Sequence, residues 1–118
     1  MLKIVEWLFG ETKSCLAVDQ FGNRRSPKWP AVRARHLQRE PICQACGTKD
    51  FLQVHHVRSF HECPELELEE GNLMTLCETP SRNCHLTFGH LYDWRRTNAD
   101  VRKDAAWWRV ERVWRRQD

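Results

Sequence analysis

The sequence predicts an α+β fold, and three features of the 118-residue chain lead to this prediction. Two short apolar and β-branched segments, 51–57 and 73–77, have the composition of β-strands. Segments 26–41 and 98–117, on either side of them, have helical patterns. Two pairs of cysteines bracket the strands. A chain of this length forms one domain, here 26–118, with a modest core that a bound metal ion can stabilise.

The first predicted helix has Ser26 as its N-cap and a proline in its first turn, and it ends before Pro41. Its core-facing side chains are expected to be Trp29, Val32 and Leu37. Arg33 and Arg35 then remain exposed, either as phosphate contacts or as a solvated face of a supporting helix. His36 is expected to be an ordinary surface residue.

The cysteine spacing predicts a metal site. Cys43-x-x-Cys46-Gly47 is typical of a zinc knuckle, in which the glycine permits the tight turn. Six residues separate Cys77 from Cys84, whereas two to four residues usually separate the ligands of such a pair. Together the four thiolates can close a tetrahedral structural Zn²⁺ site. An iron–sulfur cluster and a disulfide framework are the alternatives.

Four histidines accompany these cysteines: His55, His56, His85 and His90. Successive side chains of a strand point to opposite faces, so His55 and His56 are expected to have different roles, one as a metal ligand and one as a base. Segment 85–94 resembles a helix that is loosened at Gly89. His90 lies five residues after His85, where a regular helix would require three or four to align the two side chains.

The segment of about 98–117 is predicted to be a packing helix with Asn98 as its N-cap. Its apolar face is expected to comprise Val101, Ala105, Trp107, Trp108, Val110 and Trp114. Stacking of Trp107 or Trp108 on nucleic-acid bases is the alternative to burial.

Charge is distributed unevenly along the chain, although its net value is only +3. Segment 21–40 contains six basic residues and one acid, and segment 94–118 contains eight basic residues and four acids. This pattern indicates a polyanionic partner, with solvated helix faces as the alternative. A mean hydropathy of −0.71 leaves no room for a membrane span, and a cytoplasmic location is expected. Segment 1–25 is predicted to dock or to be flexible.

The order of these motifs resembles that of the HNH endonucleases, within their zinc-stapled ββα-metal group, over about residues 26–94. The residues that carry the resemblance are Cys43, Cys46, Val54, His55, His56, Val57, Asn72, Leu73, Leu76, Cys77, Cys84 and His85. The resemblance implies a core, 43–94, in which a β-hairpin and a helix surround one divalent ion. It implies His56 as general base, Asn72 as the residue that braces the loop between the strands, and His55 and His85 as metal ligands, with His90 as a third ligand.

The resemblance further implies a phosphodiester hydrolase of the phage or bacterial type that acts on DNA. Its catalytic ion would be Mg²⁺, Mn²⁺, Ni²⁺ or Zn²⁺, and its partner proteins would belong to a phage or restriction system. The predicted phosphate contacts are Arg33, Arg35, Arg58, Arg95 and Arg96. Two departures from the family pattern are the insert between Cys77 and Cys84 and the position of His90. The alternatives are a zinc-stapled nucleic-acid-binding module without activity and a protein-interaction zinc domain.

Overall fold

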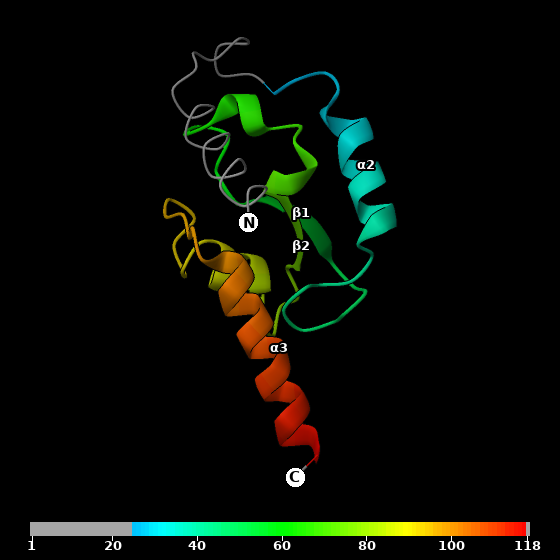
Figure 1. Ribbon diagram of the computed structural model, residues 1–118, viewed down its shortest axis with the longest axis vertical. Helices are drawn as coiled ribbons and strands as arrows, with labels where there is room; N and C mark the ends of the chain where they lie inside the picture. Colours follow the sequence, from blue (N-terminus) through cyan, green and yellow to red (C-terminus); the bar gives the residue numbers. More distant parts are fainter. Residues whose placement is uncertain (1–24, 118) are drawn as a thin grey trace, which may run out of the picture.

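The computed structural model describes the backbone of residues 25–117 and the side chains of residues 25–111 (Figure 1). Its elements are the α-helices α2 (Trp29–Arg39) and α3 (Val101–Gln117), the strands β1 (Leu52–His56) and β2 (Leu73–Cys77), the 3-10 turns η1 (Pro64–Leu66) and η2 (Glu70–Asn72), and the π-helical segment η3 (His85–Gly89). This confirms the predicted α+β class, with a two-stranded antiparallel sheet and flanking helices. The segment predicted to dock or to be flexible, residues 1–25, lies outside the described residues except for Arg25.

The hairpin of β1 and β2 separates the two sides of the domain. His56 pairs with Leu73, and His55 pairs with Met74, so each pair lies on its own face of the sheet. On one face, α2 packs with Val32 against Val54 and Leu73. On the other face, a second cluster joins the strands to the cysteines and to the beginning of α3. Helix α2 and helix α3 therefore lie on different sides of the hairpin (Figure 1).

Helix α2 faces the sheet as predicted, but it begins later. Trp29 and Leu37 pack around the buried Val32. The helix starts at Trp29, and Ser26 is not its N-cap, because residues 26–28 form a separate turn in which Trp29 N donates to Ser26 O (3.0 Å). The hydroxyl of Ser26 accepts from Lys28 N (3.2 Å) in that turn, and Lys28 is the N-cap.

The prediction that His36 is a surface residue was wrong. Its side chain is only 3% exposed, and its two ring nitrogens contact the carboxylates of Glu70 (2.7 Å) and Glu40 (3.2 Å). Glu40 also accepts from Thr75 N (2.7 Å) in β2. His36 is thus a packed polar link between α2, the sheet and the loop that joins the strands.

Helix α3 buries less of its apolar face than predicted. Val101 and Ala105 are fully buried, and Trp108 packs partly against the same cluster. Trp107 and Val110, which were expected in the core, are 61% and 55% exposed. The reason is that Trp107 and Val110 point away from the side of α3 that carries Val101, Ala105 and Trp108. The later turns of the helix project away from the domain (Figure 1). Among the described residues, no helix has the length and apolar character needed to cross a membrane.

Candidate functional site

Four cysteine sulfurs form one cluster next to the sheet. Cys43, Cys46, Cys77 and Cys84 each offer a sulfur atom within 4.8 Å of the others, and the Cys46 and Cys77 sulfurs are 3.7 Å apart. Zn–S bonds of about 2.3 Å at tetrahedral angles place sulfurs about 3.8 Å apart. Three of the four side chains are buried. The cluster therefore fits a closed structural Zn²⁺ site.

The insert between Cys77 and Cys84 folds into a tight turn that restores the second knuckle. The carbonyl of Thr79 accepts from the backbone N–H groups of Arg82 (3.3 Å) and Asn83 (2.8 Å). Asn83 takes a left-handed conformation (φ 40°), which asparagine tolerates better than most residues. The unusual spacing is therefore compatible with the same ligand arrangement. In the first knuckle Gly47 has φ 79°, as a tight turn requires.

The thiols within the cluster have strongly perturbed acidity. A hydrogen bond from Cys84 lowers the pKa of Cys43 to about 4, and the same contact raises the pKa of Cys84 above its ordinary range. One sulfur is thus stabilised as a thiolate by its neighbour's proton. A bound Zn²⁺ would supply positive charge to all four sulfurs and would favour the thiolate form of each.

Three histidines form a second cluster, on the α3 side of the sheet. His55 from β1, His85 from η3 and His90 after η3 have ring centroids 4.9 to 5.0 Å apart, and each offers a nitrogen within 4.8 Å of the others. The side chain of His55 is 3% exposed, and among the described residues its buried Nε2 has no hydrogen-bond partner. Burial lowers the pKa of His55 and of His85, which keeps both rings in the neutral form that can donate a lone pair.

The local backbone explains how His85 and His90 meet. The predicted helix over 85–94 is instead a short π-helical segment, His85–Gly89. The hydrogen bonds of a π-helix join residue i to residue i+5, so a five-residue spacing brings both imidazoles to one side. The helix ends there because Leu91 and Tyr92 take left-handed conformations (φ 51° and 69°).

Two hydrogen bonds orient the rings of this histidine cluster. Nδ1 of His85 donates to the carboxylate of Glu78 (2.9 Å), and Nδ1 of His90 donates to the carbonyl of Arg96 (2.8 Å). Because both Nδ1 atoms carry protons, the Nε2 atoms hold the free lone pairs. Ligating histidines in metal sites are commonly supported by such partners. Sequence reasoning did not identify Glu78, which lies in the insert that had seemed only a departure from the pattern.

Gly89 is required by the approach of η3 to β1. A Cβ atom at this position would lie 2.9 to 3.2 Å from three ring atoms of His55. Such distances are below ordinary van der Waals contact, and the ring is buried with little room to move. The absence of a side chain at Gly89 therefore allows His55 to reach His85 and His90.

His56 has different neighbours from His55, as the alternation of the strand predicts. Its ring packs 4.6 Å from the ring of Trp29 in α2, and its Nε2 donates to the carbonyl of Glu67 (3.0 Å). Nδ1 is then the atom with a lone pair in the neutral ring. Burial lowers the pKa of His56 to about 4, so the ring is neutral at pH 7, the form in which Nδ1 holds a lone pair.

Asn72 closes the loop that connects the two strands. Its Oδ1 accepts from Arg58 N (2.8 Å), and its Nδ2 donates to the carbonyls of Arg58 (3.1 Å) and Leu66 (3.2 Å). The buried amide thus joins the residues after β1 to the start of β2. Arg102, in α3, donates from Nη2 to the carbonyls of Gly71 (2.6 Å) and Leu73 (3.3 Å), on either side of Asn72. Sequence reasoning missed Arg102.

The five arginines predicted to contact nucleic acid are in different environments. Arg35 is exposed, whereas Arg33 donates to Gln53 Oε1 (3.3 Å). Arg95 pairs with Asp93 through two contacts of 3.2 Å, and Arg96 donates weakly to Leu91 O (3.5 Å). The backbone of Arg58 is held by Asn72. Arg95 and Arg96 lie five and six residues after His90 in the sequence.

A comparison with protein-family models gives one match, the HNH endonuclease family, over residues 43–90. These limits coincide with the first cysteine and the last histidine of the two clusters. Residues 43–90 are thus similar to the HNH endonucleases. The four-cysteine cluster fits the zinc-binding type of this family, and the match suggests a nuclease or nucleic-acid-binding function, since the family generally acts on DNA. Comparisons with curated proteins and with solved structures find no match to the chain.

Around this HNH-like region lie features that the motif does not include. Trp94 is 51% exposed, and its ring lies 5.0 Å from those of both His85 and His90. The loop that joins the strands is held by Glu67, whose buried carboxylate accepts from Ser26 N (3.0 Å) and pairs with Arg25 (3.6 Å). That loop in turn supplies the carbonyl that orients His56.

Proposed function

We propose that this protein is a metal-dependent endonuclease that hydrolyses phosphodiester bonds of DNA. The observation that carries the proposal is the histidine cluster: His55, His85 and His90 converge, and the buried Nε2 of His55 lacks a partner. An unpartnered buried nitrogen is costly unless a ligand occupies the site. A binding module without activity would need only the zinc site of the cysteine cluster. That alternative does not explain why three imidazoles converge in a second cluster.

The chemistry of these side chains suits a divalent transition ion. His55, His85 and His90 would hold the ion through imidazole nitrogens, with Glu78 and the Arg96 carbonyl behind two of the rings. Imidazole donors favour Zn²⁺, Ni²⁺ or Mn²⁺ over Mg²⁺, which prefers oxygen ligands. A bound ion would polarise the phosphoryl group and stabilise the negative charge on the departing 3′ oxygen.

The chain's own residues would activate and position the reactants. His56 accepts a proton from the attacking water at Nδ1, because its Nε2 proton is held by the Glu67 carbonyl. Trp29 packs on the ring and limits its rotation. Asn72 holds the loop that contains this carbonyl close to the end of β1. The role of each group is thus proton acceptance or positioning.

Relaxation of supercoiled plasmid across a panel of divalent ions tests the proposal. Purified zinc-loaded protein is expected to nick the plasmid with Mn²⁺, Ni²⁺ or Zn²⁺, and less efficiently with Mg²⁺. Salt-sensitive DNA binding without cleavage under any ion, unchanged by replacement of the three clustered histidines, would instead identify a binding module.

Replacing Glu78 tests the support behind the proposed ion. In Glu78→Gln the carboxylate that orients His85 is lost, and affinity for the catalytic ion is expected to fall about 10- to 100-fold. Titration of Mn²⁺ followed by nicking rate measures this affinity. Glu62→Gln, which alters an exposed acid in the loop between the strands, is the control and should leave the affinity unchanged. Equal affinities for the two variants would remove Glu78 from the site.

The substitution Gly89→Ala should reduce nicking activity strongly, although it adds only one methyl group. In Gly89→Ala the new Cβ would meet the ring of His55, so the ring or η3 must shift. A displacement of about 1 Å can reduce activity about a hundredfold. We expect such a loss of nicking, with Zn²⁺ content of the cysteine cluster unchanged. Wild-type activity in Gly89→Ala would show that His55 can relocate freely.

Arg102 is expected to affect activity indirectly, by holding the loop that contains Asn72 in position. Because its guanidinium binds the carbonyls on either side of Asn72, Arg102→Ala should allow that loop to shift and lower kcat about tenfold. KM is expected to change less, since phosphate contacts elsewhere remain. Arg109→Ala removes an exposed arginine from the same helix and serves as the control. Parallel losses in both variants would indicate only a general effect of helix charge.

A further inference from the structure

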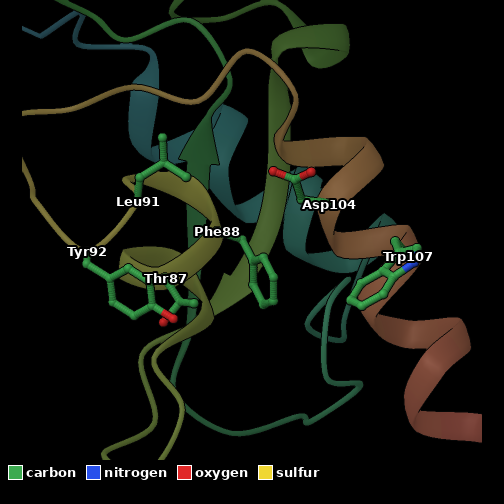
Figure 2. A pocket seen from close by; sticks show the side chains of 6 residues that line it. All are labelled: Thr87, Phe88, Leu91, Tyr92, Asp104 and Trp107. Atoms are coloured by element: carbon green, nitrogen blue, oxygen red, sulfur yellow. The ribbon is translucent and has the colours of Figure 1, made fainter.

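A pocket of about 330 Å³ lies between η3 and α3, and its lining includes no residue of the cysteine cluster or the histidine cluster (Figure 2). Its lining residues are Thr87, Phe88, Leu91, Tyr92, Asp104 and Trp107. In Figure 2 the segment around η3 supplies one wall, α3 supplies Asp104 and Trp107 opposite, and the ring of Phe88 lies between them. The volume is at the lower end of the range of about 300 to 1,000 Å³ for small-ligand pockets.

The aromatic side chains of this pocket are unusually exposed. Tyr92 is 76% exposed and Trp107 is 61% exposed, although both are large apolar groups. Tyr92 and the preceding Leu91 also take left-handed conformations, which are costly for residues with a β-carbon. Strained backbone of this kind is retained where the surroundings enforce it, and it concentrates at binding sites. Exposed rings held in this way can stack on a planar ligand.

Asp104 adds one polar group to the apolar walls. Its Oδ2 accepts from Asn98 Nδ2 (2.8 Å), and the same amide donates to Phe88 O (2.8 Å). The amide thus fixes the carboxylate relative to the aromatic wall. A carboxylate accepts hydrogen bonds from amino groups and has none to donate. The pocket therefore suits a flat ring that carries an amino group.

Basic side chains lie on both sides of the pocket. Lys103 is exposed and lies four residues before Trp107, on the same side of α3. Arg96 contacts the carbonyl of Leu91 on the opposite wall. These charges complement the phosphates that precede and follow a nucleotide, and they disfavour a lysine or arginine side chain of a protein partner.

We propose that this pocket receives one unpaired nucleobase with an exocyclic amino group, from the DNA strand next to the cleavage site. The inference rests on the proposed function, because His85 and His90 belong to the same short segment as Phe88 and Tyr92. A base removed from the duplex stacks on Tyr92 and Trp107, and its amino group donates to Asp104. The pocket thereby selects adenine, cytosine or guanine over thymine at one position.

The experiment measures binding separately from cleavage. Full-length zinc-loaded His56→Ala protein, without added divalent ion, is titrated into fluorescein-labelled oligothymidylates that carry one adenine, one cytosine, one guanine or one abasic nucleotide. Fluorescence anisotropy gives each affinity. The three amino-bearing bases are expected to bind about tenfold more tightly than thymine or the abasic nucleotide.

Variants then assign this preference to the pocket. Trp107→Ala and Tyr92→Gly should abolish it, and the glycine also accommodates the left-handed backbone of residue 92. The matched controls are Val110→Ala, exposed on the same helix, and Phe51→Gly, an exposed aromatic residue elsewhere with φ 55°. Both controls should retain the preference. Asp104→Asn should reduce the discrimination against thymine while leaving stacking in place.

Equal affinity for all oligonucleotides, or equal effects of Trp107→Ala and Val110→Ala, would overturn the proposal. So would a change from dimer to monomer in Trp107→Ala with unchanged DNA binding, since the face would then be a protein contact. The two proposals fail separately. Base-dependent binding without plasmid nicking by the parent protein would reject the nuclease function and support the nucleobase pocket. Plasmid nicking without base-dependent binding would support the nuclease function and reject the pocket.

Discussion

The substitution His56→Ala should abolish plasmid nicking while the protein keeps its zinc and its fold. His56 is the residue whose Nδ1 is left as a proton acceptor by the hydrogen bond from its Nε2 to Glu67 O (3.0 Å). Loss of a general base typically reduces rate by about 10²- to 10⁴-fold. Single-turnover nicking with saturating Mn²⁺ measures the loss, and elemental analysis measures the zinc.

The control for this substitution is His61→Ala, which removes an exposed histidine from the loop between the strands. It should nick at the rate of the parent protein. His56→Gln offers a second comparison, because the amide can retain a hydrogen bond to the Glu67 carbonyl but cannot take up a proton at pH 7. Activity in His56→Ala close to that of the parent would assign the base to another residue.

The second large effect is expected from the cysteine cluster. In Cys77→Ser the fully buried end of β2 loses one of four clustered sulfurs, so bound Zn²⁺ should be lost. Structural zinc sites contribute about 10 to 16 kcal/mol of apparent binding free energy, which exceeds the usual stability of a small domain. The variant should therefore lack a cooperative thermal transition in circular dichroism, and a strong chelator should have the same effect on the parent protein.

His90→Ala is the matched comparison for the cysteine variant, because it removes a ligand from the other cluster only. It should retain one Zn²⁺ per chain and a cooperative transition, while nicking is lost. If Cys77→Ser kept both its zinc and its melting temperature, the cysteines would not form the structural site. The contrast thus separates the metal that maintains the fold from the metal proposed to act in catalysis.

Much of this organisation was predictable because spacing along the chain constrains local geometry. A Cys-x-x-Cys-Gly turn can direct two sulfurs to one ion, and adjacent histidines on a strand must point to opposite faces. These rules predicted the cysteine set, the α+β class and the division between His55 and His56. The identity of the catalytic residues remains a prediction that only the variants can test.

Local backbone geometry and long-range packing determined the features of the site that residue spacing did not predict. The convergence of His85 and His90 depends on the π-helical segment His85–Gly89, and its approach to His55 depends on the missing side chain at Gly89. Trp107 was expected in the core because apolar residues occur around much of α3, yet only the side with Val101, Ala105 and Trp108 packs against the domain. A broad apolar pattern does not by itself show which side of the helix the rest of the domain covers.

The sequence by itself determined the candidate ligands and their order: a cysteine pair, a histidine pair, an asparagine, a second cysteine pair and two further histidines. Only the tertiary structure decided which distant groups complete the site, namely Glu78 behind His85, the Glu67 carbonyl behind His56 and Arg102 around Asn72. The physical reason is that ligand chemistry belongs to single residues and short motifs, whereas orientation comes from hydrogen bonds between segments that are brought together only when the chain folds.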